Sequence, residues 1–471
     1  MDEKQEIELR EPDYDTLQER WTDELSELLE SREMKKLQLR MEELNDFDVA
    51  EFLTSIEDNR MPMVFRLLSK ETAAEVFSHL EPPEQERIIN SITDSELAGI
   101  VEEMYVDDAV DMMEELPANV VKRVMRTATP ETRALINQYL HYPENSAGSI
   151  MTSEFVDLKK YMSVKDSFAR IRRIGRDSET IYVCFVTDAS RKLEGVVTVK
   201  DLLLADPDTE VDELMDRSVV FATTTEDQES VSEKISDYDL LALPVVDMEG
   251  RLVGIVTVDD ILDVMEQETT EDIEKMAGMM PSDKPYSRTG VMEMWKNRVP
   301  WLLFLMISAT FTSVILTHFE SMLAVQAALV AFIPMLMGTG GNSGAQASTA
   351  VIRSLSLGDT EPKDALSVMW KELRVAFVCG LTLCGVNFVK MLLLDGMILG
   401  NHEVTVSIAA TVSLSILFIV LFAKVVGSML PILAEKIGVD PAVMANPLIS
   451  TLTDAVSLLI YIYIAKLILH I

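Results

Sequence analysis

Basic residues, cysteines and histidines are scarce in this chain of 471 residues. It has 41 Lys and Arg against 78 Asp and Glu, with a formal net charge of −37. So few basic residues argue against a nucleic-acid partner, because Lys and Arg replace the counterions of a phosphate backbone. The three cysteines, Cys184, Cys379 and Cys384, are too few and wrongly spaced for a disulfide framework or a zinc site.

Catalytic motifs are also lacking. The sequence contains no P-loop, no Ser/His or Cys/His arrangement and no metal-hydrolase motif, and its five histidines are scattered. The N-terminal stretch MDEKQEIELREPDYD has no apolar core of the kind that a cleavable signal peptide needs. We therefore expect neither an enzyme nor a cleaved signal.

The excess of acidic residues is confined to one part of the chain. From Val291 to Ile471 there are 11 acidic and 10 basic residues, which leaves 67 acidic and 31 basic residues in positions 1–290. This division indicates an acidic soluble part followed by a nearly neutral part of a different kind. Such acidity would keep any domain soluble, but it also favours metal cations as partners.

Long apolar runs dominate the C-terminal part. Val299–Thr317 has no charged residue, and as a helix it would be about 28 Å long, close to the hydrocarbon thickness of a bilayer. Further runs predict four more spans, at Met322–Thr339, Val375–Leu394, Val404–Phe422 and Leu448–Leu469. Five spans would place the two termini on opposite sides of the membrane.

Basic residues near these runs predict the orientation, because they accumulate in cytoplasmic loops. They precede the first span, lie between the second and third, and lie between the fourth and fifth: Arg288, Lys296, Arg298, Arg353, Lys363, Lys371, Arg374 and Lys436. The opposite loops, His318–Ser321 and Asp395–Glu403, contain none. We expect a multi-pass membrane protein, with its N-terminus in the cytoplasm and its C-terminus outside.

One carboxylate lies inside a predicted span. Asp454 would sit about 10 Å along the fifth helix, where an ionised group facing lipid costs several kcal/mol. It must face a partner, water or an ion. A salt bridge to Lys424 is one explanation, and a site for a permeating cation is the other. The cation site is favoured, because Lys424 can extend its ammonium to the membrane surface.

A glycine-rich segment, GTGGNSGAQAST from Gly338 to Thr349, would close the second span. Its glycines allow close backbone approach and would leave carbonyl oxygens free to face a cavity. The spacing of Gly340 and Gly344 is equally typical of a GxxxG helix-packing contact, and the two interpretations are compatible. A pore for Mg²⁺ needs few direct ligands, because this ion usually keeps several waters.

The acidic part contains an internal repeat between positions 150 and 265. LEGVVTVKDLL from Leu193 recurs as LVGIVTVDDIL from Leu252, 59 residues later. Two further pairs of segments match: SIMTSEF with ELMDRSV, and YVCFVTD with LALPVVD. Each unit predicts helices around short strands, ending in a strand, a Thr turn and a helix that begins with Asp. The repeat resembles a tandem pair of cystathionine-β-synthase (CBS) domains, which form a regulatory module.

A weaker repeat precedes this pair. Between positions 68 and 126, apolar and basic residues recur at a spacing of 36, which predicts a helix-hairpin solenoid. Residues 1–35 are acidic, and we expect them to be loosely ordered. The acidic run DDILDVMEQETTEDIEKMA, at 259–277, is typical of a solvated helix face, but here it lies between a regulatory module and the first span.

These features together resemble the MgtE family of Mg²⁺ channels over essentially the whole chain, with GTGGNSGAQ and DPAVMANPLISTLTD as the membrane motifs. The resemblance implies a multidomain fold: an all-α N-domain at 36–140, α/β CBS domains at 141–208 and 209–265, a long acidic connecting or plug helix at 266–297, and a five-helix transmembrane domain at 298–471. It also implies a homodimer in the lipid bilayer, with the pore on the two-fold axis.

The resemblance assigns site residues as well. In the pore, Asp454 is the ion-binding acid, Gly338 and Asn342 lie beside the pore, and Ser450 occupies a lining position. The regulatory Mg²⁺ sites carry over onto acids that are present here: Glu75, Asp107, Asp111, Glu229, Asp239, Asp260, Asp263, Glu268, Glu271, Asp272 and Asp440, the last facing the plug. CBS pairs often take adenosine ligands, so an adenine nucleotide is a second candidate cofactor beside Mg²⁺.

The charges themselves suggest how such a channel closes. Carboxylates on facing elements repel one another by about 4 kcal/mol per pair at 4 Å before screening, and bound dications would turn this repulsion into bridges. The sequence therefore predicts a Mg²⁺ channel that cytoplasmic Mg²⁺ closes. An ion-coupled secondary transporter ranks lower, since no obvious second buried acid or histidine accompanies Asp454 as a proton relay. A nucleotide-sensing receptor that the spans merely anchor would leave Asp454 without a role.

Overall fold

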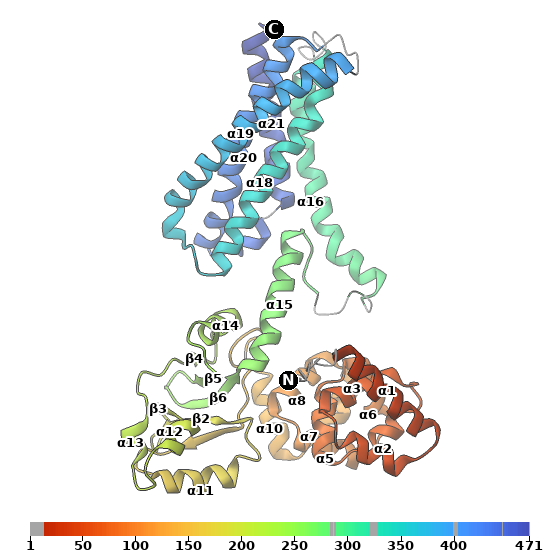
Figure 1. The fold of residues 1–471 in the computed structure, drawn as a ribbon, viewed down its shortest axis with the longest axis vertical. Coiled ribbons are helices and arrows are strands. Elements are labelled where there is room, and N and C mark those ends of the chain that lie inside the picture. The colour runs from red at the N-terminus through yellow and green to blue at the C-terminus, as the bar shows by residue number, and fades with distance from the viewer. Residues whose placement is uncertain are drawn as a thin grey trace, which may run out of the picture. The chain divides into compact units, whose positions relative to one another are not determined.

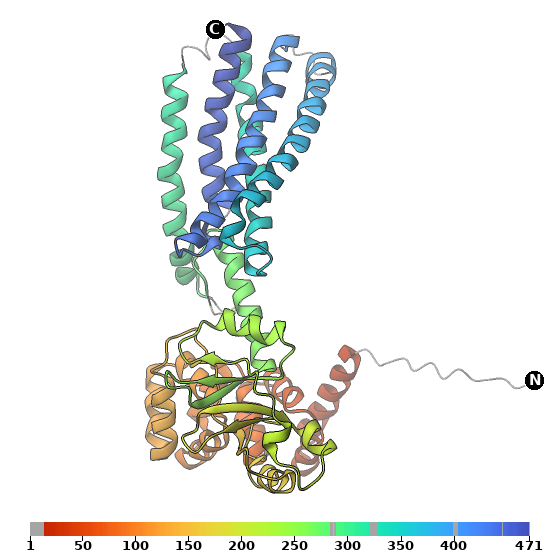
Figure 2. The same ribbon diagram turned by 90° about the vertical axis from the view of Figure 1, so that its left-hand side faces the viewer.

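The structure is a computed structural model that describes the chain except residues 1–13, 283–285, 287–288, 321–326, 399–403, 445 and 471. The chain divides into two compact units, Met1–Met265 and Glu266–Ile471 (Figure 1, Figure 2). The predicted fold class is confirmed: a helical N-domain, two CBS domains and a C-terminal region of long apolar helices.

Short helices build the first domain, coloured red to orange in Figure 1. They are α1 (Tyr14–Glu30), α2 (Met34–Met41), α3 (Asp46–Ser55), α4 (Met61–Phe65), α5 (Lys70–Ser78), α6 (Pro82–Ser91), α7 (Asp94–Glu103), α8 (Val106–Glu115), α9 (Ala118–Thr127) and α10 (Pro130–Tyr139). Side-chain caps mark several starts, such as Thr93, which forms a capping box with Glu96 at α7. The 36-residue repeat corresponds to the helix pairs α5–α6 and α8–α9.

Helix α1 corrects one expectation. Residues 1–35 were predicted to be loosely ordered, yet α1 covers Tyr14–Glu30 and α2 begins at Met34. Leu25 and Leu29 are buried in the same core cluster as Leu37 of α2. The acidic composition hid this apolar i, i+4 pair, which is enough to fix one helix face. Residues 1–13 lie outside the described part.

The two CBS domains repeat one sheet topology. The first contains β1 (Phe155–Leu158), α11 (Val164–Ile174), β2 (Thr180–Thr187), β3 (Leu193–Thr198) and α12 (Val199–Leu204), and the second contains α13 (Val211–Leu214), β4 (Ala222–Thr223), α14 (Gln228–Asp237), β5 (Ala242–Val246) and β6 (Leu252–Thr257). Each sheet has three strands in sequence order, with one parallel and one antiparallel pairing. One core cluster runs from α1 through β5 and β6, so the N-domain and the second CBS domain are packed together.

The repeated Thr and Asp are helix caps. Thr198 and Asp201 form a capping box at α12. At the matching place Thr257 Oγ1 donates to Asp260 Oδ2 at 2.5 Å, where α15 (Val258–Met276) begins. Helix α15 starts in the first unit and ends in the second (Figure 1). It ends at Met276 and α16 begins at Val291, so the predicted connecting helix at 266–297 is not one continuous helix: α15 covers its first third and α16 its last seven residues.

The second unit is a bundle of long helices, coloured turquoise to dark blue in Figure 2. They are α16 (Val291–His318), α18 (Ile333–Ser356) with the 3₁₀ turn η1 (Ala327–Phe332) before it, α19 (Ala365–Lys390) with η2 (Pro362–Asp364) before it and the π-helical η3 (Met391–Ile398) after it, α20 (Val406–Lys436), and α21 (Asn446–Leu469) with η4 (Pro441–Met444) before it. Helix α20 packs against α18, α19 and α21. Its buried residues, such as Ile416 and Ile419, belong to the hydrophobic core of the bundle.

Four segments of the described residues are long and apolar enough to cross a membrane: Val291–His318, Pro362–Gly396, Val406–Lys436 and Pro441–Leu469. They correspond to the predicted first, third, fourth and fifth spans. The second predicted span, Met322–Thr339, begins in residues outside the described part and ends inside α18. A fifth crossing therefore stays a prediction.

Candidate functional site

Asp454 lies on α21, eight residues after the helix begins, and is half-buried within the bundle. The predicted alternative, a salt bridge to Lys424, is wrong. Lys424 Nζ instead lies 3.9 Å from Glu372 Oε2 on α19, and no ion pair joins Asp454 to any residue that the structure describes. The carboxylate of Asp454 therefore remains available to an ion or to a second subunit.

The glycine-rich segment is a helix-packing surface. An added Cβ at Gly340 would lie 2.6 Å from Ser457 Oγ of α21, and one at Gly344 would lie 2.6 Å from Ile449 Cγ2. At the crossing with α20, a Cβ on Gly427 would lie 2.2 Å from the carbonyl oxygen of Gly344. The GxxxG interpretation is thus confirmed, because only glycine permits these approaches.

The expectation of free carbonyl oxygens at this segment is wrong. Residues 338–349 lie in the middle of α18, where the backbone carbonyls are used by the helix itself. The glycine face brings α18 against the face of α21 that carries Ser450, whose Oγ would lie 3.2 Å from a Cβ at Gly341. The glycines therefore position the helix that bears Asp454.

The other two residues predicted beside the pore lie on a different face of α18. Gly338 and Asn342 are one turn apart and both are exposed in the single chain. No atom of the described residues lies within 4 Å of the position that a Cβ would take at Gly338. This face is thus open to a partner subunit, water or an ion.

In the first unit, predicted regulatory acids gather where α8 meets the second CBS domain. Asp107 of α8 is buried, and its Oδ1 has no hydrogen-bond partner among the described residues. Burial and the charges of Asp108 and Asp260 raise the pKa of Asp107 well above its ordinary value. Burial, and then the charge of Asp46, raise the pKa of Glu75 on α5. Asp111 follows one turn after Asp107 on α8.

Two further acids belong to this cluster, and the sequence reasoning missed them. Burial together with the charge of Asp260 raises the pKa of Asp108 to about 7 and that of Glu179 to about 8. Glu179 Oε2 has no hydrogen-bond partner in the described part of the chain. Asp108 could have been suspected beside Asp107. Glu179 lies before β2, and nothing in the local sequence marks it.

The remaining predicted acids of the first unit lie on its surface. Glu229, on α14, and Asp239, just after that helix, are both exposed. Asp239 has a left-handed backbone, with φ +49°. Asp263 is exposed one turn after Asp260, whose pKa is raised mainly by burial and also by the charge of Asp263.

In the second unit, the end of α15 meets the loop that contains Asp440. Asp272 accepts a hydrogen bond from Ser356 Oγ at 3.3 Å, and burial, together with the charge of Asp440, raises the pKa of Asp272. Lys275 pairs with Glu271 and lies 2.6 Å from Asp440 Oδ2. The sequence reasoning did not single out Lys275. Glu268 lies one turn before Asp272 on the same helix.

Among the described residues, no three His, Cys, Asp or Glu side chains converge on a point that would hold a metal ion. The donor chemistry nevertheless suits Mg²⁺, which prefers carboxylate oxygens and usually keeps several waters. The orphaned Oδ1 of Asp107 and Oε2 of Glu179 are acceptors of this kind. The grouping of the acids into individual ion sites stays a prediction.

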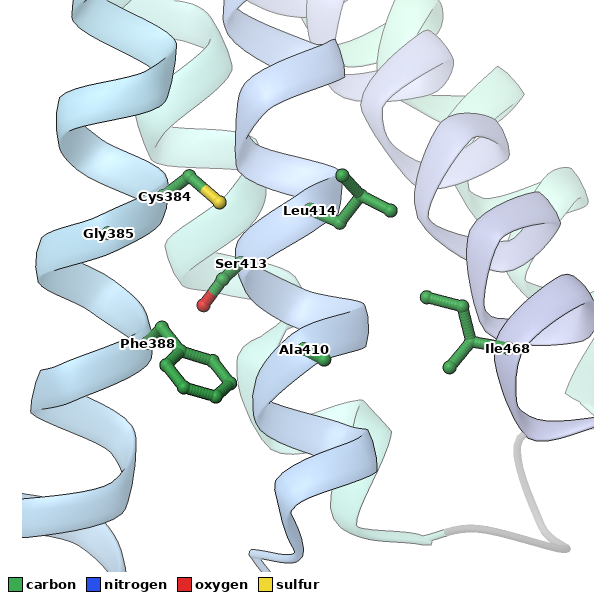
Figure 3. A pocket seen from close by; sticks show the side chains of 7 residues that line it. All are labelled: Cys384, Gly385, Phe388, Ala410, Ser413, Leu414 and Ile468. Atoms are coloured by element: carbon green, nitrogen blue, oxygen red, sulfur yellow. The ribbon is translucent and has the colours of Figure 1, made fainter.

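Each unit contains a hollow that is lined by described residues. One, of about 210 Å³, lies between the CBS sheets and is lined by Ser153, Phe155, Asp157, Thr187, Arg191 and Leu252. The other, of about 370 Å³, lies among α19, α20 and α21 and is lined by the residues labelled in Figure 3: Cys384, Gly385, Phe388, Ala410, Ser413, Leu414 and Ile468. The second hollow is apolar, as expected of a surface that faces lipid tails.

Three family models match the chain. A model of the MgtE family, described as a divalent cation transporter, matches residues 333–464. The model of the MgtE intracellular N domain matches residues 44–145, and that of the CBS domain matches residues 147–208 and 211–267.

Named relatives cover nearly the whole chain. A protein of Thermus thermophilus called magnesium transporter MgtE is 40% identical over 96% of this chain and 100% of its own length. One of the same name from Bacillus subtilis is 29% identical over 94% of this chain and 96% of its own. A crystal structure of the soluble part of a magnesium transporter, 30% identical, covers 53% of this chain and 99% of its own, with a TM-score of 0.51.

Proposed function

Since this chain belongs to the MgtE family of divalent-cation transporters, we propose that it is a Mg²⁺ channel for Mg²⁺ uptake across the bacterial inner membrane. The observation that carries the proposal is Asp454. A half-buried carboxylate on a helix that can span the membrane, joined to no described cation, is tolerable where it meets a hydrated dication.

The pore is proposed to lie on the two-fold axis of a homodimer. Two copies of Asp454 would then supply two carboxylates to one Mg²⁺, which retains its waters for the remaining positions. The exposed face of α18 with Gly338 and Asn342 supports such a surface, because none of the described residues covers it. Ser450, one turn before Asp454, would line the same path.

Closure is proposed to follow from Mg²⁺ bound by the cytoplasmic acids. At low Mg²⁺ the carboxylates around α8 repel one another, as do those near the end of α15, and bound dications would replace this repulsion with bridges. The raised carboxyl pKa values at Asp107, Asp108 and Glu179 support this account: burial is their main cause, and the charges of neighbouring acids in the ion-free protein raise them further. Because Mg²⁺ would bind the compact form better, it shifts the population towards the closed state.

The cytoplasmic side is proposed for the first unit, and an adenine nucleotide is proposed as an additional ligand of the CBS pair. The hollow between the two sheets supports a ligand there. Arg191 could meet a phosphate, and Phe155 could meet a flat ring. At about 210 Å³ the hollow is smaller than pockets for drug-sized ligands, so binding would require side chains to move.

Asp454→Asn tests the pore proposal. The variant should lose nearly all Mg²⁺ influx into liposomes that contain the purified protein, because a neutral amide cannot balance a dication. Glu435→Gln, an exposed acid at the end of α20, is the matched control and should conduct like the parent. Normal influx through Asp454→Asn, in protein of unchanged thermal stability, would refute the proposal.

A second candidate, an ion-coupled transporter, gains one observation. Sequence reasoning found no obvious second buried acid, but the Glu372 side chain is only 15% exposed and lies beside Lys424. Such a pair could exchange a proton with the transported ion. Single-channel currents in planar bilayers would support the channel. Proton movement coupled to Mg²⁺ flux, without unitary currents, would support the transporter.

A further inference from the structure

The last turn of α15 carries an ammonium between two carboxylates of different elements. Lys275 Nζ lies 2.6 Å from Asp440 Oδ2 and also pairs with Glu271, one helical turn earlier. All three side chains are partly buried, with 23% of Lys275, 30% of Glu271 and 35% of Asp440 exposed. Burial opposes the charge on Lys275, yet the hydrogen bonds to Asp440 and Glu271 raise its pKa, so it is a cation at any physiological pH.

The partners of Lys275 are themselves held in place. Asp440 Oδ1 accepts the backbone N–H of Ala442 at 2.7 Å, so this carboxylate also caps the turn η4 that leads into α21. Glu271 precedes Lys275 by four residues, the favourable order for an ion pair along a helix. The ammonium therefore links the end of α15 to the element immediately before the helix that carries Asp454.

Apolar side chains pack beside this ion pair and form an interface around it. Met276 packs against Ile352 of α18 and Ala442 of η4. Two residues later Gly278, at φ +72°, fits against Trp301, because a Cβ there would lie 2.3 Å from the indole ring. The pair differs from an ordinary surface pair such as Lys363–Glu361, in which 67% and 58% of the side chains are exposed.

The charges of this cluster explain what the ammonium does. Glu271, Asp272 and Asp440 would carry three negative charges at one interface, and Lys275 reduces the sum to two. Asp440 is also a predicted ligand of a regulatory dication, and its Oδ2 is occupied by Lys275. One oxygen cannot serve both cations at full strength.

We propose that Lys275 is a built-in cation that holds the end of α15 on the Asp440 loop when no dication is bound there, and that Mg²⁺ displaces it. This inference rests on the proposed channel function and names a residue that sets its resting state. The channel is then partly closed at zero Mg²⁺ by its own lysine. Without Lys275, closure would depend on Mg²⁺ alone and would respond to it over a wider range.

The contact itself is the first readout, because it does not depend on ion flux. In a background with Cys184, Cys379 and Cys384 replaced by Ala, the variant Met276→Cys/Ala442→Cys should form a disulfide rapidly under mild oxidation in EDTA. Adding Lys275→Gln should slow the reaction about three-fold to ten-fold, the range for loss of a partly buried ion pair. Saturating Mg²⁺ should restore the rate.

Influx at low internal Mg²⁺ is the second readout. Lys275→Gln should raise it about three-fold to ten-fold and should still close at high Mg²⁺. Lys275→Arg should behave like the parent, and Lys363→Gln is the matched control. Lys275→Cys alkylated with 2-bromoethylamine, which recreates an ammonium, should regain the low influx, whereas alkylation with iodoacetamide should not.

The outcomes separate the inference from the channel proposal. Equal disulfide rates in EDTA with and without Lys275→Gln would overturn the inference, whatever the flux. So would rescue by the neutral alkylating agent. If Asp454→Asn conducts normally while Lys275→Gln slows the disulfide, the channel proposal fails and the ammonium contact stands.

Discussion

At the scale of single residues, Lys424 and Glu372 form a charged pair within the helical bundle. Their charged atoms are 3.9 Å apart, and their side chains are 7% and 15% exposed. Glu372 Oε2 has no hydrogen bond among the described residues. Each of the two buried charges is compensated by the other. If one were removed, the remaining charge would be buried without a partner, which is unfavourable.

Removing one member of this pair should therefore cost more than removing both. Glu372→Gln should lower the free energy of unfolding by about 3 kcal/mol, since it leaves the Lys424 ammonium unpaired. The double variant Glu372→Gln/Lys424→Met should recover most of this loss. Thermal unfolding of the purified protein in detergent measures both.

Lys466→Met is the control for this comparison, because Lys466 is an exposed lysine on α21. It should leave the unfolding temperature unchanged within a degree or two. Equal losses in the single and double variants would show that the pair does not contribute as a unit.

At the scale of elements, the close crossing of α18 with α20 and α21 depends on glycines, which have no side chain to keep the helices apart. The carbonyl oxygen of Gly344 lies 2.2 Å from where a Cβ of Gly427 would be. Helices that approach so closely gain dispersion contacts along both backbones, which is the main source of helix association in lipid. Helix α21, with Asp454, is held by the same glycine face.

Alanine substitutions should distinguish packing from lining. Gly427→Ala should destabilise the bundle by about 2 kcal/mol, because the new methyl group meets backbone that cannot move away. Gly338→Ala meets nothing within 4 Å, so it should leave stability unchanged, although it could alter ion flux. Unfolding temperatures in detergent, measured beside Mg²⁺ influx, separate the two effects. A stable Gly427→Ala protein would contradict the packing assignment.

At the scale of the whole molecule, the acids around α8 link stability of the first unit to pH and to Mg²⁺. The folded-state pKa values of Asp108 and Glu179, about 7 and about 8, lie above the values near 4 of an unfolded chain. Their contribution to stability is therefore full below about pH 4 and is lost as the pH rises through 7 to 8. In the ionised protein, a bound dication would compensate the repulsion.

Hydrogen exchange of α8 in the full-length protein should report this linkage. In EDTA, exchange should become faster between pH 6 and pH 9 by more than the intrinsic chemical rate, and 10 mM Mg²⁺ should reverse the increase. The double variant Asp108→Asn/Glu179→Gln should lose part of the pH dependence, because it removes two of the carboxyl groups with a raised pKa while Asp107 and Asp111 keep theirs. Exchange in α11, which lies in the first CBS domain, serves as the internal control.

Much of this molecule could be predicted from its sequence. The CBS pair was recognisable because separate blocks recur in order, and the structure explains one of them: Thr198 with Asp201 and Thr257 with Asp260 are helix caps. Four predicted spans correspond to long apolar helices, because a bilayer imposes a length and a composition that are legible one residue at a time. The GxxxG contact could also be predicted, because the spacing of its two glycines is a local pattern in the sequence.

Other features required the fold. The partner of Lys424 proved to be Glu372, 52 positions away in the chain, and no periodicity links the two. Glu179 reaches the acids of α8 because a CBS sheet packs near the N-domain, and Lys275 meets Asp440 across 165 positions.

The sequence by itself determined the architecture, the membrane segments and the acid within one of them, since these depend on local pattern and on the high cost of charge in lipid. Only the tertiary structure decided which charges meet. Electrostatic interactions act over a few ångströms in space, irrespective of the distance along the chain.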